Sequence, residues 1–273
     1  MTGLAGRWRL QELREYVSAL QPEWSVECVP TIDSTNSELM RRLRAGQVAS
    51  GVLVAERQSA GRGRMGRVWH GAASDAPGQL PGALTFSLSV VLAPGQWSGL
   101  SLAVGVAIAE SLHAGIGLKW PNDLWWQERK LAGILIETAN VGERRYAVIG
   151  VGVNITPCDS QGLTTPPACL QECLPGIDAA AALQRIVPAL AQALGVFEAR
   201  GLAPFLGAFR ERDVLAGRSI ALSDGTCGEA TGVDVSGALL MHTSTGMLTI
   251  TSSEVSVRPL SMLRVPTDGP PVL

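Results

Sequence analysis

The segment SAGRGRMGRVWH, residues 59–70, restricts the possible folds of this chain more than any other stretch. Its glycines have the G-x-G-x-x-G spacing of dinucleotide-binding loops, which lie between a strand and a helix. The preceding GVLVAERQ favours a strand, but the sequence that follows has clustered Gly and Pro and no helical period. No acidic residue ends a following strand, where a ribose would need it. The pattern therefore argues against a doubly wound dinucleotide fold.

Three arginines, Arg62, Arg64 and Arg67, lie between and after these glycines. The loop is either a solvated basic turn or a ligand loop, since guanidinium groups suit carboxylate and phosphate oxygens. Residues two apart in an extended segment share a face, so we expect Arg62 and Arg64 to converge on one anion or two adjacent anions. Gly63 would leave the backbone open to that ligand. A general nucleic-acid interface is not expected, because the formal net charge is −2.

Hydrophobic periodicity predicts an N-terminal region of alternating helices and strands and a different C-terminal region. The helix after Asp33 carries a capping-box pattern at Thr35 and Glu38 and should stop at Gly46. The last long helix should kink or begin late at Pro188. Short Gly-punctuated runs from about Val214 predict a small all-β barrel. The expected helices are 7–20, 33–46, 98–113 and 178–200; the expected strands are 24–30, 51–58, 84–92, 117–126, 129–139 and 146–155; residues 71–83 should be a surface loop, 156–176 irregular and 266–273 a frayed tail.

Cysteine usage and the N-terminus indicate a reducing compartment. The five cysteines are scattered and odd in number, and with three distant histidines they show no metal-ligand spacing. The N-terminus has no signal-peptide pattern, and the longest uninterrupted apolar runs, such as LAVGVAIA, are too short to span a bilayer. We therefore expect a cytoplasmic protein that makes no membrane contact.

Several short polar stretches allow either a structural or a chemical interpretation. In KWPNDLWW, Lys119, Asn122 and Asp123 form either a polar turn or a cluster that handles a nucleotide phosphate and its magnesium. In RKLAGILIE, Lys130 is either a solvated hairpin lysine or a site residue at the start of a buried strand. Asn154 in GVGVN is either a turn residue or a ligand contact.

Two further parts of the sequence allow either a structural or a ligand-binding interpretation. In DSTN, Ser34 and Thr35 either only cap a helix or also bind a polar ligand head at that helix N-terminus. Trp69 either belongs to the core or stacks on a base. The residues alone do not decide between these interpretations.

Taken in order, DSTN, GRGRMGRVW, KWPNDLWWQERKLAGILIE and GVGVN resemble the biotin protein ligase family. GLAPFLGAFRERD and a C-terminal GALL…SEVSVR extend the similarity from about Val29 to the end of the chain. The resemblance implies an α+β fold related to class II aminoacyl-tRNA synthetases, with a mixed sheet flanked by helices and a C-terminal SH3-like β-barrel. It places a catalytic domain at 26–213 and the barrel at 214–265, after a helical extension at 1–25.

The resemblance also implies a reaction. The biotin carboxylate attacks the α-phosphate of MgATP to give biotinyl-5′-AMP, and a lysine of a biotin carboxyl carrier protein then displaces AMP. Magnesium would be bound through the ATP phosphates and by no protein metal site. Asp123 is the candidate for accepting the proton of the carrier lysine, and a homodimer is possible. The implied catalytic residues are Arg64, Lys130 and Asp123; the biotin contacts are Ser34, Thr35, Asn36, Gln58, Arg62, Gly63, Arg64 and Lys130; the ATP contacts are Arg67, Trp69, Lys119, Asn122, Asn154 and Arg258.

The chain departs from the family pattern in three places. Met65 stands where members often have a second basic residue, and the stretch after Trp69 is longer than usual and carries Asp75. About 25 residues with a single predicted helix precede the catalytic region, which is too few for the helix-turn-helix domain of repressor members. We therefore expect no nucleic-acid partner.

Two alternative functions remain. A lipoate or octanoyl ligase of related fold is disfavoured, because that family typically carries a Ser/Gly-rich loop followed by a histidine. A non-catalytic binder that keeps the fold is disfavoured because Arg64 and Lys130 are both present.

Overall fold

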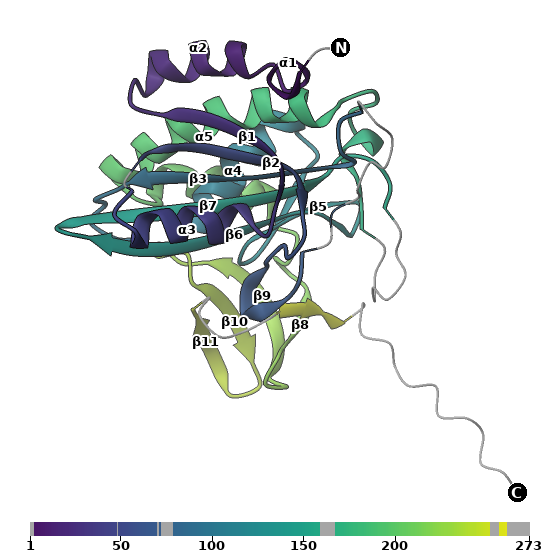
Figure 1. Cartoon of the computed structure of the whole chain (residues 1–273). Coiled ribbons are helices and arrows are strands. Elements are labelled where there is room, and N and C mark those ends of the chain that lie inside the picture. Colours follow the sequence, from purple (N-terminus) through teal and green to yellow (C-terminus); the bar gives the residue numbers. More distant parts are fainter. Residues whose placement is uncertain are drawn as a thin grey trace, which may run out of the picture.

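The computed structural model of the chain describes residues 3–47, 49–69, 71, 79–158, 167–251 and 257–260. A seven-stranded sheet with helices on both faces is followed by a smaller five-stranded sheet (Figure 1). The helices are α1 Leu4–Arg7, α2 Leu10–Leu20, α3 Thr35–Arg44, α4 Leu100–Leu112, α5 Ala179–Arg200 and α6 Leu206–Arg212, with 3-10 turns η1 Arg64–Gly66, η2 Leu170–Glu172 and η3 Ala203–Phe205. The strands are β1 Ser25–Ile32, β2 Gly51–Gln58, β3 Ala83–Val91, β4 Gly117–Lys119, β5 Asp123–Trp126, β6 Arg129–Val141, β7 Arg144–Asn154, β8 Ser219–Leu222, β9 Cys227–Val233, β10 Leu239–Thr243, β11 Gly246–Ile250 and β12 Val257–Pro259.

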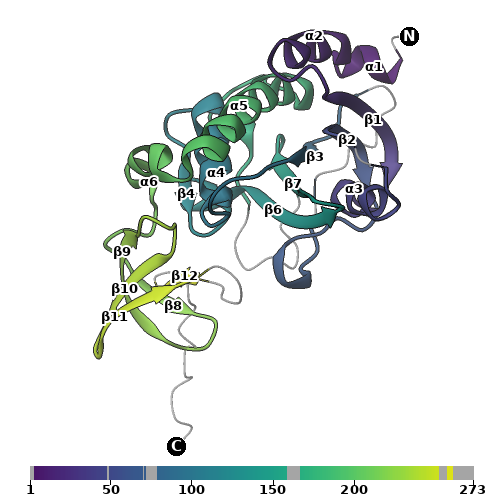
Figure 2. The ribbon, with the colours of Figure 1, turned by 90° about the vertical axis from the view of Figure 1, so that its left-hand side faces the viewer.

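The large sheet has the strand order β1-β2-β3-β7-β6-β5-β4. Strands β1 and β2 are parallel and every other neighbouring pair is antiparallel. Helices α4 and α5 cover one face, whereas α3 packs on the other (Figure 2). The predicted mixed sheet flanked by helices is therefore confirmed. The predicted strand 117–126 is two strands, because Pro121 lies between β4 and β5.

The strand register explains why the α3 face leaves room for a ligand. Residues directly opposite each other in neighbouring strands share a face. Thr85 of β3, Gly152 of β7 and Gly133 of β6 form one such row. Ser87, Gly150 and Leu135 form the next row. Polar and glycine residues thus alternate with the apolar residues of the opposite face, and the glycines leave part of the α3 face without side chains.

The N-terminal helical region belongs to the main hydrophobic core. Its helix is interrupted at Arg9, which adopts a left-handed conformation with φ 50° between α1 and α2. This break lets Trp8 turn inward, where it is fully buried and its indole N–H donates to Glu56 Oε1 at 3.1 Å. Trp8, Leu13 and Val17 pack in one cluster with strands of the large sheet. The segment expected as an extension therefore contributes to the sheet's packing.

The N-cap of helix α3 is one residue earlier than the capping-box pattern predicted. Ser34 is the N-cap, and its hydroxyl accepts from the backbone N–H of Ser37. The predicted Thr35–Glu38 capping box is wrong, because Glu38 pairs with Arg41 and Arg42. Thr35 instead turns its side chain into the protein. The predicted stop at Gly46 is confirmed, since this glycine has φ 76° just beyond the last turn.

Helix α5 runs without interruption from Ala179 through Pro188 to Arg200, so the predicted late start was wrong. Burial of this helix against α2 and α4 offsets the backbone hydrogen bond that Pro188 cannot make. The helix is long and apolar enough to span a bilayer by length and composition. It is nevertheless packed inside the protein, with residues such as Leu183 and Leu190 fully buried.

Replacing Asp178 with alanine is expected to lower the free energy of unfolding by about 1 kcal/mol, because it removes the N-cap of α5. The Asp178 carboxylate accepts from the backbone N–H of Ala181 at 2.6 Å. Urea denaturation monitored by circular dichroism would measure the change. Asp178→Ser keeps an N-cap acceptor and should recover most of the loss; equal destabilisation by both variants would contradict the capping role.

The C-terminal strands form an antiparallel sheet with the order β11-β10-β9-β8-β12. Within the described residues no ladder joins β11 to β12, so the sheet is open where a closed barrel was expected. It contacts the large sheet region through Trp120, whose indole N–H donates to the carbonyl of Gly237 at 3.0 Å. The expected frayed tail, residues 266–273, lies outside the described residues, as does most of the predicted loop at 71–83.

Candidate active site

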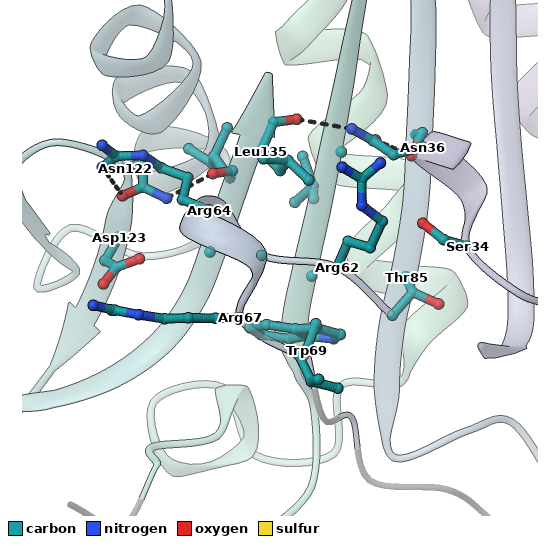
Figure 3. Close-up of a pocket in the computed structure, with 18 of the residues that line it drawn as sticks. Ser34, Asn36, Arg62, Arg64, Arg67, Trp69, Thr85, Asn122, Asp123 and Leu135 are labelled. Atoms are coloured by element: carbon teal, nitrogen blue, oxygen red, sulfur yellow. Dashed lines mark hydrogen bonds between the residues drawn. The ribbon is translucent and has the colours of Figure 1, made fainter. Parts of the chain in front are cut away.

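A pocket opens on the α3 face of the large sheet, with a volume of about 930 Å³ including its mouth. Figure 3 shows side chains from β3, β5, the α3 N-terminus and the arginine–glycine segment around it. The pocket has an end near α3 that carries no net charge, because Arg62 is paired there with Glu137, and a cationic end near β5; the first is named the uncharged end. Its lining includes Ser34, Thr35, Asn36, Gln58, Arg62, Gly63, Arg64, Arg67, Trp69, Lys119, Asn122, Asp123 and Lys130, all of which the sequence predicted.

The arginine–glycine segment folds into a small hairpin over this pocket. Arg62 pairs with Val68 in an antiparallel bridge. The backbone N–H of Gly63 donates to Arg67 O at 2.7 Å. The chain reverses at η1, where Met65 has a left-handed φ of 56°. Of the residues from the end of the hairpin to β3, the structure describes 69, 71 and 79–82, and none of these is helical.

The two arginines of the hairpin point in different directions (Figure 3). Arg62 forms an ion pair with Glu137, with 3.2 Å between Arg62 Nη1 and Glu137 Oε1. Arg64 reaches the other end of the pocket and donates to Asn122 Oδ1 at 3.1 Å. The expected convergence of Arg62 and Arg64 was therefore wrong, because η1 reverses the chain that the prediction treated as extended.

Trp69, the last residue of the hairpin, lies against a pair of facing glycines. A Cβ atom on Gly152 would be 2.4 Å from Trp69 Cε2, and one on Gly133 would be 3.5 Å from Trp69 Cζ3. The Lys130 ammonium lies 5.9 Å from the centroid of the Trp69 ring. The backbone N–H of Trp69 donates to Gly61 O at 2.9 Å, which links the residue that carries the ring to the start of the hairpin.

The cationic end holds more positive than negative charge. Lys130 Nζ donates to Asp123 Oδ1 at 2.7 Å. Asp123 is the acidic side chain among the described lining residues, whereas Arg64, Arg67 and Lys119 line the same end. Within the described part of the chain, no three His, Cys, Asp or Glu side chains lie together as metal ligands. The excess positive charge favours an anionic ligand.

Burial and neighbouring positive charges lower the pKa of two cations at this end. Burial, together with the charges of Lys130, Arg67 and Arg258, lowers the pKa of Lys119 to about 8 against the opposing effect of Asp123. Burial, aided by Arg67, also lowers the pKa of Arg64. These cations are less stable than they would be in water, so an anion that entered the pocket would relieve their repulsion.

The uncharged end is built from buried hydroxyl and amide groups. The Thr35 backbone N–H donates to Gln58 Oε1 at 2.7 Å. The Thr35 hydroxyl lies 2.7 Å from Ser87 Oγ, and Ser87 donates to Asn36 Oδ1 at 2.6 Å. Ser34, Thr35 and Asn36 are each at most 3% exposed. This end can recognise a neutral polar group without competition from bulk water.

Two predicted contacts lie outside the pocket lining. Asn154 ends β7, where its Nδ2 donates to Ala168 O and its Oδ1 is buried without a described partner. Arg258 is on β12, and its positive charge contributes to the lowered pKa of Lys119 in the pocket. Its neighbour Val257 lines the pocket. Asn36 lines the pocket, but its amide groups are taken by Ser87, Leu135 and Glu137. Its predicted direct contact with biotin is therefore not favoured.

Sequence reasoning missed the residues of the sheet that form the floor. Their signal was the alternation of polar residues with apolar ones in LTFSLSVV and of glycine with apolar residues in IGVGVN. Glu137, which follows the RKLAGILI run, had no signal of its own. The missed lining residues are Thr85, Ser87, Gly133, Leu135, Gly150 and Gly152; Glu137, also missed, lies outside the lining and accepts from Asn36.

Comparisons with known proteins identify the family of the chain. The model of the Biotin/lipoate A/B protein ligase family matches residues 28–154. The chain is 35% identical to the bifunctional ligase/repressor BirA of Escherichia coli over 249 residues, covering 86% of this chain and 74% of that protein. It is 35% identical to the biotin--[acetyl-CoA-carboxylase] ligase of Paracoccus denitrificans over 238 residues, covering 82% of this chain and 96% of that protein.

Solved structures give the same result for the fold. The biotin protein ligase from Aquifex aeolicus in complex with biotin and ATP superimposes with a TM-score of 0.71 at 27% identity. The match covers 86% of this chain and 99% of that one. The chain therefore belongs to the biotin protein ligase family, within the biotin/lipoate A/B protein ligases, and it is an enzyme of the ligase class.

Proposed function

We propose that this protein activates biotin with ATP to biotinyl-5′-AMP and then transfers the biotinyl group to a lysine of a biotin carboxyl carrier protein. One observation carries the proposal: a single pocket has a buried uncharged polar end and a cationic end. Biotin has a cyclic urea at one end and a carboxylate at the other. The urea suits Ser34, Thr35 and Gln58, and the carboxylate suits the cationic end.

In the first step a biotin carboxylate oxygen attacks the α-phosphorus of ATP, and the bond to the bridging oxygen breaks to release pyrophosphate. Both reactants are anions, so their approach requires cations. Lys130 and Arg64 are the proposed groups on the reacting carboxylate and phosphate, since they lie at the same end of the pocket near Asp123. Arg67, Lys119, Asn122, Asn154 and Arg258 are proposed for the triphosphate side, and Trp69 for the base.

In the second step the ε-amine of the carrier lysine attacks the acyl carbon, and the bond between this carbon and the phosphate oxygen breaks to release AMP. The amine must lose a proton. We propose Asp123 as its acceptor, because its carboxylate lines the pocket beside Lys130.

Magnesium is proposed to arrive on the ATP phosphates, whose oxygens are its preferred ligands. We also propose a reducing cytoplasmic location, which suits the five free cysteines, all within the described residues.

Biotin-dependent ATP–pyrophosphate exchange tests the proposed function, with lipoate and octanoate as parallel substrates. Exchange with biotin alone is the expected result. Exchange with lipoate or octanoate would move the chain to the lipoate branch, although neither acid offers a polar ring to the uncharged end. A folded protein that exchanges with none of the three acids would contradict the ligase function.

ATP affinity is expected to fall as the pH rises above about 8, the pKa of Lys119. A phosphate beside Lys119 favours its charged form, so binding above this pH must take up a proton and weakens by up to about tenfold per pH unit. Titration calorimetry at pH 8.5 in buffers of different ionisation enthalpy would measure the uptake. Lys119→Arg keeps its charge and should flatten the pH dependence; an unchanged slope would assign the proton to another group.

A further inference from the structure

A buried chain of hydrogen bonds connects the uncharged end of the pocket with Glu137 on β6. The Thr35 and Ser87 hydroxyls are 2.7 Å apart, and Ser87 Oγ donates to Asn36 Oδ1 at 2.6 Å. Asn36 Nδ2 then donates to Glu137 Oε2 at 3.0 Å. Ser87 is fully buried and Asn36 is 3% exposed, so these groups depend on one another for partners.

Two acceptors that cannot donate determine the direction of every bond in this chain: Asn36 Nδ2 donates to the Glu137 carboxylate at 3.0 Å and to the Leu135 carbonyl at 3.3 Å. A carboxylate accepts hydrogen bonds and donates none, so Asn36 must turn its NH₂ group toward Glu137 and its oxygen toward Ser87. Ser87 has one proton and gives it to Asn36, so Ser87 accepts from Thr35. The single hydroxyl proton of Thr35 is thereby used, and its 3.1 Å contact with Gln58 Oε1 carries no proton. Thr35 Oγ1 can therefore accept from a ligand but cannot donate to it.

The neighbouring groups have the opposite polarity. Ser34 Oγ accepts from the Ser37 N–H, and its own proton is donated to no group in the described part of the chain. Gln58 Oε1 accepts from the Thr35 N–H, which leaves the NH₂ group of Gln58 for the pocket that this residue lines. The uncharged end thus presents an acceptor beside donors.

We propose that Glu137 is a positioning residue for biotin selection, which it exerts by fixing the donor direction of the Thr35–Ser87–Asn36 chain. The inference rests on the proposed function. A cyclic urea places N–H beside C=O and matches an acceptor beside donors, whereas a dithiolane ring or an alkyl chain offers no N–H to Thr35. The same carboxylate holds Arg62 at 3.2 Å, so it also links the hairpin to the sheet.

Two single substitutions disturb the hydrogen-bond chain in different ways. Glu137→Gln keeps the shape but can donate, so only the 3.3 Å bond to Leu135 O still holds the orientation of Asn36, and the polarity of Thr35 is less strongly fixed. Asn36→Asp keeps an acceptor for Ser87 but places a carboxylate against both Glu137 and Leu135 O, which separates these groups. Each variant is expected to weaken biotin binding by about 10- to 30-fold, the effect of one unsatisfied buried polar group. The KM for ATP and kcat should change by less than about threefold, because the cationic end is untouched.

The double variant Asn36→Asp with Glu137→Gln restores the direction. The new carboxylate at position 36 accepts from Ser87 and from the new amide at position 137, and the net charge equals that of the wild type. Biotin affinity should return to within about threefold of the wild-type value, since the polarity seen by Thr35 is recovered. The Arg62 ion pair and the bond from position 36 to Leu135 O are not restored, so recovery separates the direction of the chain from both contacts.

The test measures biotin binding by titration calorimetry and the KM values for biotin and ATP in pyrophosphate exchange, with all variants compared. Glu143→Gln, at the exposed tip of the β6–β7 hairpin, is the control for loss of a carboxylate and should behave as the wild type. KM does not depend on the fraction of active enzyme, so both KM values can be compared directly between variants. Wild-type affinity in Glu137→Gln, or a double variant as weak as Glu137→Gln, would overturn the inference. Absence of biotin-dependent exchange in the wild type would instead overturn the proposed function.

Discussion

Replacing Lys130 with methionine is expected to lower biotin-dependent ATP–pyrophosphate exchange by about 10²- to 10³-fold, the usual cost of removing one group that stabilises developing charge. Methionine keeps an unbranched stem beside Trp69, above which the Lys130 ammonium now lies, and removes only the charge. The loss should appear in kcat as well as in kcat/KM, since the cation acts most strongly when carboxylate and phosphate meet. Arg144→Ala, an exposed cation at the start of β7, is the control and should retain full exchange.

A second variant separates the charge of Lys130 from its pairing with Asp123. Lys130→Met leaves the Asp123 carboxylate, now 2.7 Å from Lys130 Nζ, without this partner. If the missing cation causes the defect, adding Asp123→Asn should not restore exchange. Recovery in the Lys130→Met, Asp123→Asn double variant would show that the unpaired carboxylate was the cause and that Lys130 has no direct catalytic effect.

Replacing Gly152 with alanine is expected to lower kcat/KM for exchange by about 100-fold and to destabilise the fold by about 1–3 kcal/mol, the range for overpacking a filled site. The added Cβ would lie 2.4 Å from Trp69 Cε2, a distance that forces the ring to move. Because the Trp69 N–H is bonded to Gly61 O, movement of the ring also shifts the hairpin that carries Arg64. Exchange kinetics and urea denaturation would measure the two effects.

The matched control is Gly195→Ala in α5, where an added Cβ meets no atom within 4 Å. This change should leave exchange intact and raise stability by about 0.5–1 kcal/mol, because alanine suits a helix better than glycine. In the Gly152→Ala background, Trp69→Phe removes the indole atoms nearest the new methyl and should restore part of the lost stability. If Gly152→Ala is as active and stable as the wild type, the glycine pair does not seat Trp69.

The family resemblance carried by short motifs predicted most of the pocket lining, whereas the residues alone left their roles open. Arg64, Trp69, Asn122 and Lys130 were each predicted from these motifs, and all line one pocket. The mixed sheet was also predictable, because alternation and helical periodicity are local properties of the chain. The assignment of Thr35 as the cap of α3 failed, since Ser34 and Thr35 are both good capping residues and only the packing of Thr35 against Ser87 decides between them.

The sequence by itself determined most of the order of helices and strands, the polar and cationic residues of the pocket, and the family. Only the tertiary structure decided which side chains pair across the sheet. The β6–β7 register places Gly133 opposite Gly152 and so makes the seat of Trp69, and the position of α3 brings Asn36 to Glu137. A register depends on packing on both faces of the sheet, and a hydrogen bond between residues 101 positions apart depends on the whole fold. The direction of the Arg62 and Arg64 side chains was decided in the same way, by a chain reversal that local spacing does not encode.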